Sequence, residues 1–203
     1  MKKLILINTL LILFSAACGC TKDKMQDELP SITQTGANTF GLVYDGVVFT
    51  PTDAKSRGFG IDGGPTSGLA VFGYYYDTEH YSNGIEAIRY SNIKNLREIY
   101  IHIYQLESLG IGTYLLGNYG VREGFRKPYN NYIWIYGTSS ITGELVSYCS
   151  YENSGEVNIT RKDEDNNIFS GTFYGKLKSA DGTEVIEITD GRFDINKRKV
   201  NSK

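Results

Sequence analysis

Two-residue alternation of apolar and polar side chains in the last third of the chain constrains the fold most. Residues 168–177 alternate in this way, Asp181-Gly182 supplies a turn, and residues 184–195 return with the same period. Side chains of a β-strand point alternately to two faces, so this period matches strands and excludes a helix. The sequence therefore predicts a C-terminal β-hairpin.

Shorter runs of the same kind precede this hairpin. Residues 39–44 and 47–49 flank Asp45-Gly46, a dipeptide that supplies the positive φ of a two-residue hairpin turn. A single helical turn is expected near residues 92–95 or 106–109. Further strands are expected at residues 69–76, 85–90, 96–104, 112–116, 132–136 and 156–160.

The composition agrees with a fold made of strands. The chain has 16 Tyr and 23 Gly but only 4 Pro in 203 residues, which favours strands and tight turns. Roughly ten short strands predict an all-β fold, either a single antiparallel β-sandwich or a lipocalin-like β-barrel. The sequence does not separate these two. A transmembrane barrel is a weaker alternative, because it requires strands of about ten residues.

The N-terminus has the layout of an export signal. A basic start is followed by an apolar run over residues 4–14 and by small residues that lead to Cys18 and Cys20. The apolar run is too short to span a bilayer and remain there. A cysteine after small residues resembles a lipobox, whose thiol receives diacylglycerol and palmitate. Cys20 is the favoured lipid attachment site and Cys18 is the alternative; an ordinary secreted protein remains a further possibility.

These features divide the chain into four segments. They are a lipoprotein signal peptide (1–19), a flexible tether (20–37), an all-β domain (38–198) and a short tail (199–203). Processing at Cys20 leaves Cys149 as the only other thiol, so no intramolecular disulfide is expected. Removing residues 1–19 takes away two lysines and no acid, which leaves 19 basic against 23 acidic residues and a net charge of about −4. Nucleic acid is therefore not an expected partner.

Two stretches resemble a Bacteroidetes lipoprotein family of uncharacterised function. The first is residues 29–46, which read LPSITQTGANTFG and continue into the Asp45-Gly46 turn. The second is residues 166–195, with NNIFSGTF at its start and ITDGRFDI at its end. Cys20 and the Lys22-Asp23 pair after it also resemble the surface-export signal of Bacteroidetes lipoproteins. The resemblance implies an exported all-β lipoprotein and brings no activity or catalytic residue.

Two strands carry different kinds of residue on their two faces. In residues 99–104 and 132–136, isoleucines alternate with aromatic side chains or His102. If the isoleucines fill the core, the aromatic face is either covered by a second sheet or a long loop, or used for binding. Flat rings with polar tips suit stacking against a sugar ring. The candidate ligand-binding residues are Tyr132, Trp134, Tyr136, Tyr100 and Tyr104.

No catalytic residue, cofactor or metal site is predicted. Residues 58–63 match the G-x-G-x-x-G spacing of dinucleotide loops but lack a following helix, so a surface loop is the simpler interpretation. Residues 163–167 match part of a calcium loop, and a polar turn explains them equally well. Glu187, Asp190 and Asp194 are acids from which a hydrolase would have to be built.

The sequence thus predicts an exported outer-membrane lipoprotein that faces the cell surface or the periplasm. Its membrane contact is the lipid anchor, and its oligomeric state is not determined. The favoured function is a non-catalytic binding module for glycan or another extracellular ligand. The alternative is a structural or assembly accessory of an envelope protein complex, and a hydrolase is the third hypothesis.

Overall fold

The fold is a single antiparallel sheet that curls over itself into a half-barrel. The computed structural model describes residues 28–53, 67–75, 81–90, 96–119 and 129–202. Within these residues the strand order is β2-β1-β10-β9-β8-β7-β5-β4-β3, and β6 adds to β8. The strands are β1 (Thr39–Tyr44), β2 (Val47–Phe49), β3 (Leu69–Tyr75), β4 (Tyr81–Ile88), β5 (Leu96–Tyr104), β6 (Gly112–Leu115), β7 (Tyr132–Thr138), β8 (Leu145–Asp163), β9 (Ile168–Ser179) and β10 (Val185–Asn196).

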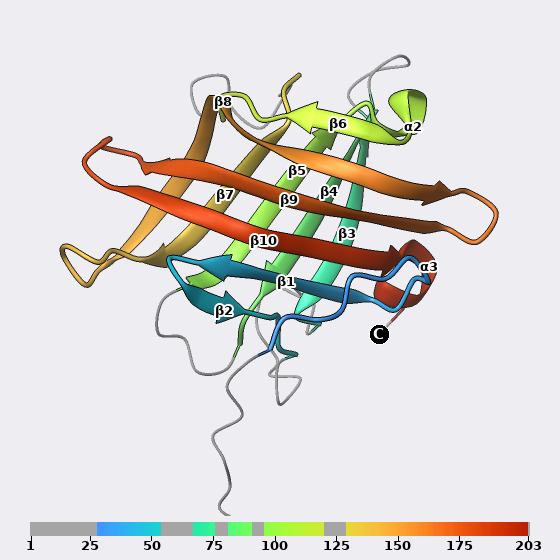
Figure 1. The fold of residues 1–203 in the computed structure, drawn as a ribbon, viewed down its shortest axis with the longest axis horizontal. Helices are drawn as coiled ribbons and strands as arrows, with labels where there is room; N and C mark the ends of the chain where they lie inside the picture. The colour runs from blue at the N-terminus through green and yellow to red at the C-terminus, as the bar shows by residue number, and fades with distance from the viewer. Residues whose placement is uncertain (1–27, 54–66, 76–80, 91–95, 120–128, 203) are drawn as a thin grey trace, which may run out of the picture.

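The curled sheet has two layers (Figure 1). The front layer contains β1, β2, β9, β10 and β6, and the strands β3, β4, β5 and β7 cross behind it at a steep angle. Two short helices, α2 (Leu106–Leu109) and α3 (Lys197–Val200), lie at one end of the half-barrel. Neither of these described helices has the length or apolar content needed to cross a membrane.

The long strand β8 belongs to both layers. Its first half pairs with β7, its second half pairs with β6, and β9 follows it along both halves. The register with β9 shifts between Ser150 and Gly155, where the strand bends. A Cβ on Gly155 would lie 2.5 Å from the Cα of Gly175, so a larger residue does not fit at this bend.

The core lies between the two layers. Ile99, Ile101, Ile133 and Ile135 point into it from the back layer and are fully buried. Apolar residues of β1, β9 and β10 meet them from the front, among them Phe40, Phe169, Phe173, Leu177, Ile188 and Phe193. Each side chain of this size contributes about 1.5–3 kcal/mol when it leaves water, so this double layer of apolar side chains is the main stabilising contribution.

The edge strand β3 is closed by the C-terminal end of the chain. The side-chain amide of Asn201 accepts a hydrogen bond from the Val71 N–H (3.1 Å) and donates one to the Val71 carbonyl (2.7 Å). Val200 is buried in the core next to it. The amide takes the place of a neighbouring strand and protects part of an edge that would otherwise be open to another chain. Residues 199–202, which were expected to form a tail, are therefore packed against the domain.

The carboxylate of Asp194 fixes the segment before β1 to the sheet. The backbone N–H groups of residues 35–37 donate to it over 2.8–3.2 Å, and the hydroxyls of Thr33 (2.6 Å) and Ser170 (2.7 Å) donate as well. Burial alone raises the pKa of Asp194, but these hydrogen bonds outweigh it and hold the pKa well below its usual range. Residues 28–37, predicted as part of a flexible tether, are instead attached to the domain, and we call them the strap.

The predicted all-β antiparallel fold is confirmed. The Asp45-Gly46 hairpin, the strand over residues 96–104 and the helical turn over residues 106–109 all lie where the sequence places them. Two strands begin earlier than predicted: β4 at Tyr81 and β8 at Leu145. The expected helical turn near residues 92–95 lies outside the described residues, as do the signal peptide, Cys18 and Cys20.

We predict that Asp194→Asn lowers the free energy of unfolding by about 2–4 kcal/mol, because an amide cannot accept from all the donors and leaves buried N–H groups unpaired. Urea unfolding at neutral pH measures this change. Asp190→Asn is the matched control: Asp190 is exposed and contacts Arg192 at 3.5 Å, so a change of less than about 0.5 kcal/mol is expected. Equal unfolding midpoints for the two variants would contradict the role of Asp194.

Candidate functional site

The outer face of the back layer carries the predicted aromatic residues. On β5 and β7 the isoleucines point into the core, which places Tyr100, His102 and Tyr104 with Tyr132, Trp134 and Tyr136 on the opposite side. The register sets Tyr100 directly opposite Trp134 and His102 opposite Tyr132. The five candidate residues therefore share one surface, as the alternation predicts.

These side chains differ in how much solvent they reach. Tyr132 is only 4% exposed because it stacks on His102 at 4.7 Å and meets the edge of Tyr119 at 4.9 Å. Tyr100, Tyr104, Trp134 and Tyr136 are half-buried. Tyr132 therefore packs beneath its neighbours, and only the more exposed rings are accessible to a ligand.

Three of these rings form a continuous surface, which we call the aromatic row: Tyr100, Trp134 and Tyr136. The planes of Trp134 and Tyr136 are parallel within 2° and their centroids are 6.2 Å apart. Tyr100 lies beside them across the strand pair. Tyr104 is further along β5 and packs edge-on against Tyr129 at 5.7 Å, so it lies at the margin of this surface.

Gly84 makes room for Tyr100, and sequence reasoning missed it. A Cβ on Gly84 would approach the Cζ of Tyr100 to 2.7 Å, so the Tyr100 ring extends over the bare backbone of β4. A glycine inside a strand often marks such a close approach. The run Tyr81–Ile88 contains this glycine at its centre, which was the available signal.

Two glutamates border the aromatic row and were also missed. Glu86 on β4 lies opposite Tyr100, and Glu98 on β5 lies opposite Tyr136. Both are half-buried, and they lie diagonally across the β4–β5 ladder on the same face. Burial is the main cause that raises the pKa of each group above its usual range. The outer face thus combines flat rings with two hydrogen-bond acceptors.

His102 has a structural role beneath this surface. Its Nε2 lies 2.8 Å from the Ser82 hydroxyl and its Nδ1 lies 2.9 Å from the Asn130 carbonyl oxygen. A serine beside a histidine resembles a nucleophile and its base. Ser82 is 0% exposed and His102 only 1%, so no substrate reaches the pair in this conformation. Burial lowers the pKa of His102 to about 4, against a partial opposing effect of the Asn130 hydrogen bond.

Asp190 and Asp194, two of the acids considered for a hydrolase, lie in different surroundings. Asp194 is buried and has both oxygens bonded to the strap and to Ser170. Asp190 is exposed, has a φ of 52° at the β10 bulge and pairs with Arg192. The hydrogen bonds of Asp194 leave it unsuited to proton transfer, so these residues provide no pair of catalytic carboxylates.

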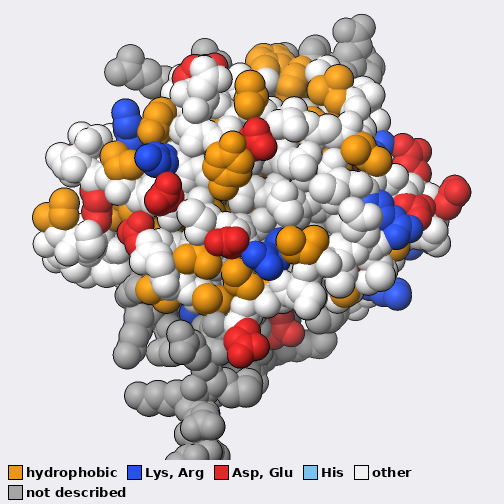
Figure 2. Space-filling model, viewed as in Figure 1, with side chains coloured by type: hydrophobic (Ala, Val, Ile, Leu, Met, Phe, Trp, Pro, Cys, Tyr) orange, Lys and Arg blue, Asp and Glu red, His pale blue; other side chains and the backbone are white. Residues whose placement is uncertain are grey.

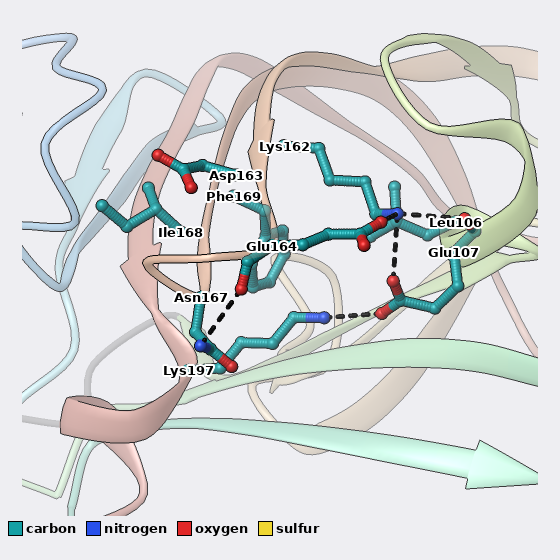
Figure 3. Close-up of a pocket in the computed structure, with 9 residues that line it drawn as sticks. All are labelled: Leu106, Glu107, Lys162, Asp163, Glu164, Asn167, Ile168, Phe169 and Lys197. Carbon is teal, nitrogen blue, oxygen red and sulfur yellow. Dashed lines mark hydrogen bonds and ion pairs between the residues drawn. The ribbon is translucent and has the colours of Figure 1, made fainter.

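A polar pocket of about 200 Å³ lies between α2, α3 and the β8–β9 turn (Figure 3). Glu107 binds Lys197 at 2.7 Å and Lys162 at 3.1 Å, and Lys162 also contacts Glu164 at 2.6 Å. Leu106, Ile168 and Phe169 supply its apolar lining. The two lysines are thus paired with Glu107 and Glu164, and this network joins the two helices to the β8–β9 turn across the end of the half-barrel.

The remaining sequence candidates divide into two groups. Residues 58–63 lie outside the described residues. Residues 163–167 form the turn between β8 and β9, in which Asp163 accepts hydrogen bonds from Asn166 and Arg161. Within the described ranges no three His, Cys, Asp or Glu side chains are grouped to hold a metal ion. Cys149 is partly buried, and burial raises the pKa of its thiol to about 11.

Comparisons with known proteins return nothing: no family model, no curated protein and no solved structure matches this chain. The resemblance to Bacteroidetes lipoproteins therefore stays a prediction. The proposal of a function therefore rests on the side chains of the outer face.

We predict that the free energy of unfolding falls by about 2 kcal/mol between pH 7.5 and pH 5 because of His102. Its pKa is about 4 in the fold and about 6.5 when unfolded, so the unfolded chain takes up the proton first and stability is lost as the pH drops through this interval. Urea unfolding at both pH values tests this. In His102→Gln, which cannot titrate, the difference should shrink accordingly, and an undiminished difference would assign it to other groups.

Proposed function

We propose that this chain is a non-catalytic, lipid-anchored binding module of the cell envelope and that it binds glycan on the aromatic row. The observation that carries the proposal is the arrangement of Tyr100, Trp134 and Tyr136 beside Glu86 and Glu98 on one partly exposed sheet face. A sugar ring presents C–H groups that pack on aromatic faces and hydroxyl groups that donate to carboxyl oxygens. The outer face carries aromatic rings and carboxyl groups on directly neighbouring strands.

The chemistry of the rest of the chain supports this choice. The export signal and the cysteines after it would place the domain in the cell envelope, where polysaccharides are abundant partners. The expected negative charge of the processed chain disfavours polyanions such as nucleic acid. The rigid sheet holds the rings in place before a ligand arrives, which lowers the entropy cost of binding.

We predict that Trp134→Ala weakens glycan binding by about tenfold or more, because an aromatic anchor of a binding surface contributes about 2 kcal/mol. An array of neutral glucans, mannans and xylans, followed by affinity gels with the retained polysaccharide, measures the effect. Trp134 is the only tryptophan of the chain, so its fluorescence reports binding to the wild-type protein independently. Tyr174→Ala is the control, because Tyr174 is 53% exposed on the front layer. Binding that Trp134→Ala leaves unchanged would remove the proposal.

One observation favours the alternative, an assembly accessory. Among the described strands β6 pairs only with β8, and Leu109, Ile111 and Leu115 around it are 59–63% exposed. Figure 2 shows apolar side chains gathered along the upper edge of the front face, over β6. A partner protein could add an extended segment to this edge and cover these side chains.

For this alternative we predict that Leu115→Lys releases a partner that the wild-type protein retains in a pull-down from envelope membranes, because a charge replaces an exposed apolar side chain on β6. The proteins retained by both forms are compared by mass spectrometry, with Val185→Lys, at an equally apolar exposed position on β10, as the control. Identical sets of retained proteins would count against an accessory role through β6.

A further inference from the structure

The Glu86–Glu98 pair is the feature of the outer face that neither the fold nor the aromatic row explains. The two side chains come from neighbouring strands and occupy the same face, diagonally across the β4–β5 ladder. Both side chains are half-buried, so water screens the repulsion between two negative charges at these positions only partly. The repulsion falls when the pair holds one proton, because the protonated carboxyl can then donate a hydrogen bond to the other. The placement of the two side chains therefore favours a shared proton.

Among the residues that the structure describes, the charges around the pair leave this proton as its main compensation. Arg97 on β5 attracts Glu98 but is exposed to solvent. Arg89, which follows β4, lies over the Phe49 ring at 4.9 Å and donates to the carbonyls of Val48 and Thr50. Tyr90, which follows β4, and Tyr136 on β7 carry the neighbouring hydroxyl groups. Lys178 on β9 is four strands from Glu86, at the far end of the same cross-strand row.

Resting on the proposed function, we propose that a ligand rich in hydroxyl groups displaces the proton shared by Glu86 and Glu98 when it binds the aromatic row. In the free protein the O–H of one carboxyl donates to the other. On binding, this O–H bond breaks, the proton passes to the buffer, and ligand hydroxyls donate to the carboxylate oxygens in its place. The pair then acts as a specificity determinant, because a ligand without hydroxyl donors cannot replace the proton.

The sign of the pH effect follows from this exchange. Because binding releases up to one proton, the affinity rises with pH while the free pair is still protonated, by at most about tenfold per pH unit. Burial raises the pKa of both glutamates, and the charge of Glu98 raises the pKa of Glu86 further, so the effect lies above the usual glutamate range of about 4.3. His102 is already neutral in that range, since its pKa is about 4.

The first test needs no ligand. Trp134 lies opposite Tyr100, which in turn lies opposite Glu86. We follow the fluorescence of Trp134 as a function of pH in the wild type and in the Glu86→Gln/Glu98→Gln double variant. We expect a transition above pH 4.3 in the wild type that is absent from the double variant. A fluorescence titration that is the same in both proteins would overturn the shared proton and with it the inference.

The second test measures binding at pH 5 and pH 7 with the neutral polysaccharide that the array retains most strongly. The wild type should bind several-fold more tightly at pH 7, and Glu98→Gln, whose amide donates permanently to Glu86, should bind weakly at both values. Glu187→Gln, an exposed change on β10, should behave like the wild type. Binding that depends on Trp134 but not on pH would overturn the inference and leave the proposed function standing; absence of binding at both values would overturn both.

Discussion

The bend of β8 is the constraint on which the two-layer structure depends. A single strand pairs with β7 in one layer and with β6 in the other, so the sheet can cover its own apolar face only if β8 changes direction. The insertion between Ser150 and Gly155, and the close approach of Gly155 to Gly175, allow that change. Without it the isoleucines of the back layer and the phenylalanines of the front layer could not meet, and the outer face of β5 and β7 would have no fixed support.

The sequence predicts those elements whose burial alternates regularly. The hairpin of residues 39–49, β5 and the C-terminal strands have one face in the core along their whole length, so apolar and polar residues follow the period of two. The first half of β8 shows no such period, because this strand moves from one layer to the other and its faces change surroundings. The strap and α3 were missed because single polar side chains, Asp194 and Asn201, hold them, and such bonds leave no pattern in a sequence.

The aromatic residues of the candidate site could be predicted as a group, but their individual roles could not. Alternation places Tyr100, Trp134 and Tyr136 on one face, whereas the burial of Tyr132 depends on Tyr119, which a distant loop brings over it. The contribution of Glu86 depends on which strand lies beside β5, and this register is not visible in a local stretch of sequence. A surface made by neighbouring strands is known only once their pairing is known.

The attachment of the strap to Asp194 has a mechanical consequence. Any pull on the chain before residue 28 acts first on the strap, which is tied to β10 by the hydrogen bonds of Asp194 and lies against β1 through the contact of Pro30 with Gly41. β10 is an inner strand with a neighbour on each side, so the load enters the sheet away from its free edges. A domain held by a surface-bound N-terminus could then resist shear from its surroundings without its strands being peeled away one at a time.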